Sequence, residues 1–176
     1  MPEGPSSTSK ITLREQLSII ALIILLLSIL LLPMRKLSTT MTTQTALLVK
    51  SIGAPVTSVT NWHIPQPGPK QIQVRVTVAG LNPHDQKGRD SGLFIKDSLP
   101  AILGADVVGV VTTLGDGASR FKSGDRVFGQ ASTAPGSVSK ALQEYAVLDE
   151  DFAAGVPEGI SEDEVATLPT NLLAGK

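Results

Sequence analysis

The sequence predicts a mainly β fold, in which a small, partly open β-barrel is followed by short helices. From about residue 45 onward, short apolar runs are separated by turn-forming residues, a pattern typical of all-β domains. Near the C-terminus this pattern gives way to a helix start at Ser161. Many short strands followed by helical structure indicate a barrel with a helical tail.

The predicted strands differ in how they are buried. Segment 71–79 alternates strictly between polar and apolar residues. Ile72 and Val74 therefore face away from Gln73, as in a half-buried antiparallel strand. Segment 106–114 is nearly all apolar, which indicates a strand buried on both faces. Further strands are expected at 46–50, around Trp62, at 126–128 and at 141–148, with a flexible loop at 132–139.

The helical tail is expected to begin with a capping box. Ser161 and Glu164 form the motif S-x-x-E, in which each side chain satisfies a free backbone amide at a helix start. A short helix is therefore expected from Ser161 through Leu168. Pro169 follows it, and a further helix start is expected after this proline.

The composition excludes several classes of site. The chain has 176 residues, a net charge of −1, no cysteine and two histidines. It therefore has no disulfide and no thiolate ligand, and a histidine-rich metal site is not expected. A charge near zero provides no basic face, so no nucleic-acid partner is expected. Because aromatic residues make up only 3% of the chain, the core must be aliphatic.

An uncharged apolar segment, residues 17–34, precedes the predicted domain. Residues 1–16 are expected to be a disordered polar leader, residues 35–43 a Ser/Thr-rich linker, and residues 44–176 the folded domain. At 18 residues, the apolar segment is at the short edge of what spans about 30 Å of hydrocarbon. It has no polar face, so a hydrophobic helix is expected here, and a transmembrane helix is one interpretation of it.

Three interpretations of this segment stay open. It is a membrane anchor, or a cleaved signal peptide with Lys10 and Arg14 as its basic leader, or upstream sequence outside a working protein that begins at Met41. Basic residues are slightly more numerous after the segment than before it, which favours a membrane-anchored protein with a cytosolic domain. A start at Met41 predicts a cytoplasmic protein instead.

Two glycine turns carry the clearest functional signal. The first, Gly80–Pro83, follows the alternating strand, where glycine permits a sharp turn and proline stops the strand. Asn82 is thereby presented at a strand end, where its amide can face a cleft. The second turn, residues 103–106, opens the buried strand. Its Asp106 is expected to anchor the turn by accepting backbone amides rather than to act as a base.

These turns, together with the motif N-P-x-D-x-K at residues 82–87, resemble the medium-chain dehydrogenase/reductase family. The similarity is to its zinc-less branch of quinone oxidoreductases and fungal enoyl reductases, and it implies a GroES-like domain over about residues 45–175. In zinc-dependent relatives, metal ligands stand in place of Asn82 and Ala105. A methyl group cannot bind zinc, so no catalytic zinc and no other metal site is expected.

The resemblance also implies roles for three side chains. Asn82 would border the nicotinamide and substrate pocket, Lys87 would polarise a carbonyl or bind a cofactor phosphate, and Tyr145 would reach the substrate. From the residues alone, Asn82 could instead cap its own turn, Lys87 could be solvated and Tyr145 could be a packing residue. His84, in a polar loop, is expected to be a surface residue, and His63 a structural one.

The activity that the resemblance implies is reduction of a small-molecule quinone or enoyl compound by NADPH. The chain contains no dinucleotide-binding glycine motif, and it ends at Lys176, where relatives continue into a nucleotide-binding domain. We therefore expect a substrate-side domain that is inactive alone, because hydride transfer needs the nicotinamide held in near-contact with its acceptor. The alternative is a membrane-anchored, non-catalytic module for binding or assembly.

Overall fold

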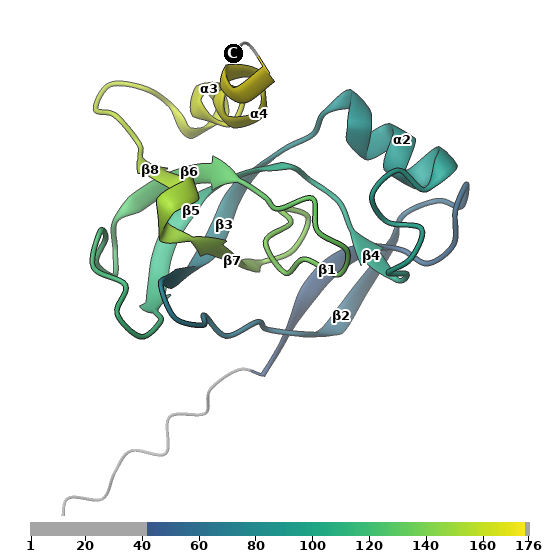
Figure 1. Ribbon diagram of the computed structural model, residues 1–176, viewed down its shortest axis with the longest axis horizontal. Coiled ribbons are helices and arrows are strands. Elements are labelled where there is room, and N and C mark those ends of the chain that lie inside the picture. The colour runs from purple at the N-terminus through teal and green to yellow at the C-terminus, as the bar shows by residue number, and fades with distance from the viewer. Residues whose placement is uncertain (1–41, 175–176) are drawn as a thin grey trace, which may run out of the picture. The chain divides into compact units, whose positions relative to one another are not determined.

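The computed structural model describes residues 42–174, and these residues form two antiparallel β-sheets (Figure 1). The first sheet has the strand order β2-β1-β4. Its strands are β1 (Thr43–Val49), β2 (Thr57–His63) and the short β4 (Ala101–Ile102). β1 thus begins at the last residue of the predicted linker. The segments predicted within residues 1–41 lie outside the described part of the chain.

The second sheet has five strands in the order β7-β3-β5-β6-β8. They are β3 (Gln71–Gly80), β5 (Asp106–Leu114), β6 (Arg126–Gln130), β7 (Tyr145–Asp149) and β8 (Ala153–Gly155). β3 and β5 are the long central pair, running antiparallel from Ile72 opposite Leu114 to Gly80 opposite Asp106. This pairing places the end of β3 beside the start of β5.

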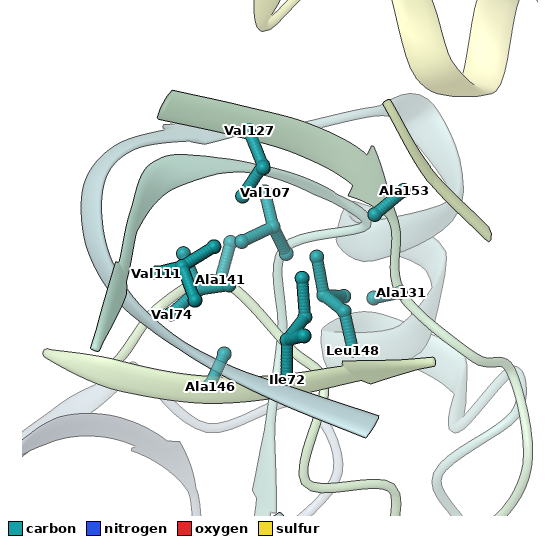
Figure 2. Close-up of a cluster of buried hydrophobic side chains, with 10 residues drawn as sticks. All are labelled: Ile72, Val74, Val107, Val111, Val127, Ala131, Ala141, Ala146, Leu148 and Ala153. Carbon is teal, nitrogen blue, oxygen red and sulfur yellow. The ribbon is translucent and has the colours of Figure 1, made fainter. Parts of the chain in front are cut away.

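The main core is formed mostly by side chains of this second sheet. It is aliphatic, as the composition predicted. Ile72 and Leu148 are its largest fully buried side chains, and they point toward Val107 and Val127 across the interior (Figure 2). Burial of each such side chain stabilises the fold by about 1.5–3 kcal/mol. The core therefore fixes β3, β5, β6 and β7 relative to one another.

The predicted burial of the strands is confirmed in large part. Ile72 and Val74 are buried and Arg75 is exposed, as the alternation in β3 required. Gln73 is buried as well, because its amide donates to the carbonyl of Pro65 at 2.8 Å and its Oε1 accepts from Thr112 Oγ1 at 2.7 Å. A polar side chain is tolerated in the interior when its hydrogen bonds are satisfied in this way.

The mainly β prediction is confirmed, but the described strands form two open sheets instead of one barrel. The strand predicted at 141–148 begins only at Tyr145. The preceding residues cross to the first sheet, where Gln143 forms a bridge with Ala46 and the Leu142 carbonyl accepts the Leu47 N–H at 2.9 Å. This stretch therefore links the edges of two sheets instead of extending β7.

The predicted polar loop after Gly80 is in fact a helix, α2 (Pro83–Ser91). The proline stands at the first helical position, where its fixed φ angle favours a helix. The carboxylate of Asp85 accepts the N–H of Asn82 at 2.8 Å, and Gly92 ends the helix with φ 81°. His84 consequently lies on a helix, and its exposure is intermediate.

The C-terminal part contains three short helical elements, η1 (Glu150–Phe152), α3 (Glu162–Val165) and α4 (Leu168–Ala174). The predicted capping box at Ser161 is confirmed, since Glu164 Oε2 accepts the Ser161 N–H at 2.9 Å and Ser161 Oγ accepts the Glu164 N–H at 3.3 Å. α3 packs on the five-stranded sheet through the fully buried Val165. Over residues 42–174, no helix is long and apolar enough to cross a bilayer.

A close approach between β3 and β5 gives a test of this packing. A methyl group at Gly109 would overlap the backbone carbonyl of Arg75 and lie 2.8 Å from Val74 Cγ1. We expect Gly109→Ala to lower the free energy of unfolding by about 1–3 kcal/mol in urea denaturation. Gly155→Ala is the matched control, because a methyl there meets nothing within 4 Å, and it should change stability by less than about 0.5 kcal/mol. Equal stability of the two variants would contradict the described contact.

Candidate functional site

The candidate site is centred on Asn82, which follows the end of β3 and precedes the first residue of α2. Gly80 allows close packing here, because a side chain at this position would lie 2.6 Å from the Ala166 carbonyl and 2.7 Å from Asp106 Cβ. The end of β3 therefore needs glycine to pack closely against both β5 and Ala166, which follows α3. Asn82 itself has extended backbone angles, φ −123° and ψ 162°.

A buried carboxylate, Asp106, holds the Asn82 side chain. Asp106 is the first residue of β5 and is only 2% exposed. Its Oδ2 accepts from Asn82 Nδ2 at 2.8 Å, and its Oδ1 accepts from both the N–H and the hydroxyl of Thr170, at 2.9 and 2.6 Å. Asp106 does accept a backbone N–H, but from the distant Thr170 instead of from its own turn as predicted. Its bond to Asn82 was not predicted.

The hydroxyl of Thr170 completes the network. It donates to Asp106, accepts from Gln130 Nε2 at 3.2 Å and lies 3.5 Å from Asn82 Nδ2. Both amide hydrogens of Asn82 therefore have acceptors within this network. Turning the amide over would place Asn82 Oδ1 against a carboxylate oxygen, so its orientation is fixed. Asn82 Oδ1 faces the Asp85 N–H in the capping box of α2, but that N–H donates to the Asn82 backbone carbonyl at 2.9 Å. Oδ1 therefore keeps capacity to accept a hydrogen bond from a ligand.

A second carboxylate joins the two glycine turns. Asp85, on α2, is 5% exposed, and its Oδ2 accepts the Asn82 N–H while its Oδ1 accepts the Gly104 N–H at 2.9 Å. The two turns identified separately in the sequence are thus held against each other. The neighbouring Ala105 is 2% exposed and presents only a methyl group.

A cavity of about 510 Å³ lies beside Asn82. It is lined on one side by the helix residues Pro83, Gln86 and Arg89 and on the other by Leu103 and Leu142. The cavity therefore combines apolar walls with a few polar groups, the usual character of a small-molecule site.

The other two predicted site residues lie apart from this cavity. Lys87 is exposed on α2, and neither it nor Tyr145 lines the cavity. Tyr145 is half-buried in β7, where its N–H donates to Gln44 Oε1 at 2.6 Å. That they contact a substrate or cofactor stays a prediction.

Three further polar residues have local structural contacts. Asp125 accepts the Lys122 N–H at 2.9 Å, and Arg126 pairs with Glu162 at 2.9 Å. The His84 Nε2 atom lies 3.9 Å from Asp85 Oδ2, and its ring contacts Phe94 edge-on. Within the described residues, no three His, Cys, Asp or Glu side chains are grouped so that they could hold a metal ion.

Three residues that hold the site were not predicted from the sequence. Asp85 carried a signal, because N-P-x-D places an acidic residue at the third position of a helix that starts with proline. Thr170 and Gln130 carried none, since their contacts depend on chain segments that are 64 and 40 residues apart.

With the fold and the site in place, comparison with known proteins identifies the family. Residues 68–159 match the family model of the alcohol dehydrogenase GroES-like domain, and the chain belongs to this family. Its curated relatives include the chloroplastic quinone-oxidoreductase homolog of Spinacia oleracea, which is 36% identical over 112 residues. A trans-enoyl reductase of Gibberella fujikuroi is 38% identical over 106 residues.

These matches cover 62% and 58% of this chain, and they span only 33% and 29% of the two relatives. Among solved structures, the quinone oxidoreductase from Coxiella burnetii superposes with a TM-score of 0.66 at 29% identity. That superposition covers 73% of this chain and 41% of the other. The chain therefore corresponds to one part of longer proteins of this family.

The Asp106 network predicts a specific stability loss on removal of one hydroxyl. Thr170→Val removes one of the three donors to Asp106 and the acceptor of Gln130. We expect the free energy of unfolding to fall by about 1–3 kcal/mol. Thr167→Val makes the same chemical change at an exposed hydroxyl nearby and should cost less than about 0.5 kcal/mol. Denaturant melts of both variants measure the difference, and equal losses would contradict the network.

Proposed function

We propose that this domain forms the substrate side of the active site of a zinc-independent, NADPH-dependent oxidoreductase acting on a quinone or an enoyl compound. The observation that carries the proposal is the fixed Asn82 amide, whose oxygen keeps acceptor capacity beside a cavity. The named quinone and enoyl reductases among the relatives support the reaction class.

In this proposal, Asn82 acts as a hydrogen-bond acceptor. Since its amide hydrogens are engaged by Asp106 and Thr170, its Oδ1 is suited to accept a hydrogen bond from an N–H or O–H group of a ligand. A nicotinamide carboxamide and a cofactor ribose both carry such groups. The fit to NADPH therefore rests on an oriented acceptor, and the cofactor would supply the hydride.

A different group must then polarise the substrate carbonyl. We assign it to Lys87, the exposed cation on α2, with binding of a cofactor phosphate as its other role. Tyr145 is proposed to contact the substrate through its phenol. Neither side chain lines the Asn82 cavity, so both would have to reach a substrate from beside it.

The residues around Asn82 do not fit a zinc centre. The chain has no thiolate, Ala105 offers only a methyl group, and the oxygens of Asp106 are already occupied by Asn82 and Thr170. Structural and catalytic zinc sites need three or four N, S or O ligands converging on one point. We therefore propose that the reaction uses no metal.

A fusion protein tests this proposal. The full 176-residue chain is joined to the nucleotide-binding part of the Spinacia oleracea relative, and NADPH oxidation is followed with a quinone and with an enone. We expect oxidation that depends on the acceptor and persists in EDTA. Asn82→Ala should lower kcat/KM about tenfold or more, the equivalent of about 1.4 kcal/mol. The matched control, Asn61→Ala, changes an exposed asparagine and should leave it unchanged.

Two outcomes would contradict the proposal. One is a folded, NADPH-binding fusion that turns over neither acceptor. The other is activity that requires added zinc. The chain without the fusion is expected to bind NADPH more weakly than micromolar, and tight binding would show that residues 1–176 hold the cofactor themselves.

A further inference from the structure

A second cavity lies away from Asn82, between the first sheet and the loop that precedes β7. Its volume is about 170 Å³. Its apolar walls are formed by Trp62, Phe94, Ile95, Ile102 and Val138. A cavity of about 150 Å³ with walls of this kind can hold one benzene-sized ring.

One wall of this cavity is formed by a lysine. Lys140 lines the cavity and is only 8% exposed. Among the described side chains its Nζ forms neither a hydrogen bond nor an ion pair, and the nitrogen itself keeps some contact with solvent. Buried lysines are rare and are normally paired, so a lysine in this setting calls for a ligand or a chemical role.

The backbone around Lys140 is held firmly. Gln143 Nε2 donates to the carbonyls of Lys140 and Val138, at 2.8 and 3.0 Å. Gln143 Oε1 accepts from Gln44 Nε2 at 3.0 Å, and this buried amide pair ties the loop to β1. The amine therefore extends from a fixed backbone.

The cavity wall also includes an aromatic residue with an unusual backbone conformation. Phe94 has a φ of 64°, a conformation that bulky residues rarely adopt, and its side chain is 49% exposed. Residues held in such conformations cluster at ligand sites, because surrounding contacts must maintain them. Its ring is thus kept at the cavity wall instead of packing into the core.

The charges around Lys140 favour a neutral ligand over an anion. Burial lowers the pKa of the Lys140 amine, and the nearby Asp85 carboxylate opposes this effect. Both Asp85 oxygens already accept backbone N–H groups, so Asp85 acts on the amine only through its field. An anion in the cavity would meet that negative field, whereas a neutral carbonyl would not. The other titratable groups nearby are His63, on the cavity wall, and His84, beside Asp85.

We propose that Lys140 is a reactive amine that binds small aromatic aldehydes or ketones as imines in this cavity. The neutral Nζ forms a bond to the carbonyl carbon, the π pair moves to oxygen, and a proton passes from nitrogen to oxygen to give a carbinolamine. Loss of water then gives the imine, so that amine and carbonyl yield imine and water with no change of oxidation state. This site is independent of the proposed reductase function and needs no cofactor.

Reductive trapping tests the proposal on the full chain. Benzaldehyde and sodium cyanoborohydride are added at pH 7, and the modified lysine is located by peptide mass spectrometry. We expect Lys140 to be labelled several times faster than the exposed Lys96, because a lowered pKa leaves more of the amine neutral at pH 7. Labelling of Lys140 should also level off at a lower pH than labelling of the other lysines.

The only tryptophan, Trp62, gives an independent readout because it lines the same cavity. Benzaldehyde with cyanoborohydride should change its fluorescence permanently in the unaltered chain and in Lys96→Arg. In Lys140→Arg, which keeps the charge, and in Lys140→Met, which keeps the length, the permanent change should be lost. Labelling spread evenly over the exposed lysines would overturn the proposal, as would a permanent change that survives in both Lys140 variants.

Discussion

The hydrogen bonds of one buried carboxylate, Asp106, determine the geometry on which the candidate site depends. An ionised carboxylate removed from water is unstable unless donors replace its hydration. Here the donors come from Asn82 and from Thr170, which lie 24 and 64 residues away in the chain. Because the Asp106 carboxylate needs hydrogen-bond donors, the turn after β3 and the start of α4 are held against β5. The same bonds decide which atom of Asn82 remains available to a ligand.

The position of this carboxylate follows from the sheet. β3 and β5 pair so that Gly80 lies opposite Asp106, and the absence of a side chain at Gly80 leaves room for both Asp106 and the Ala166 carbonyl. The aliphatic core then holds these strands in register. Strand pairing and close packing thus make the site rigid. Asp85 adds a hydrogen bond that links α2 to the second glycine turn.

Local patterns in the sequence predicted much of this architecture. Contacts between residues far apart in the chain could not be predicted in this way. The alternation in 71–79, the apolar run at 106–114 and the capping box at Ser161 each depend on neighbours within a few residues. All three elements are present, although Gln73 is buried and the second half of 106–114 is only partly buried. α2 was missed because Pro83 was taken as the end of a strand, although proline also begins helices. The bond between Asp106 and Thr170 could not be predicted, since nothing local in either segment indicates its partner.

The most direct test of the central claim is hydrogen exchange of the Asn82 side-chain amide, measured by NMR on the ¹⁵N-labelled full chain. The signal is assigned from its loss in Asn82→Ala, and the exposed Asn61 serves as the internal reference. Bonds to Asp106 and Thr170 predict that the Asn82 amide protons exchange more slowly than those of Asn61, and that Asp106→Ala removes the difference. Equal exchange at the two asparagines in the unaltered chain would contradict the account.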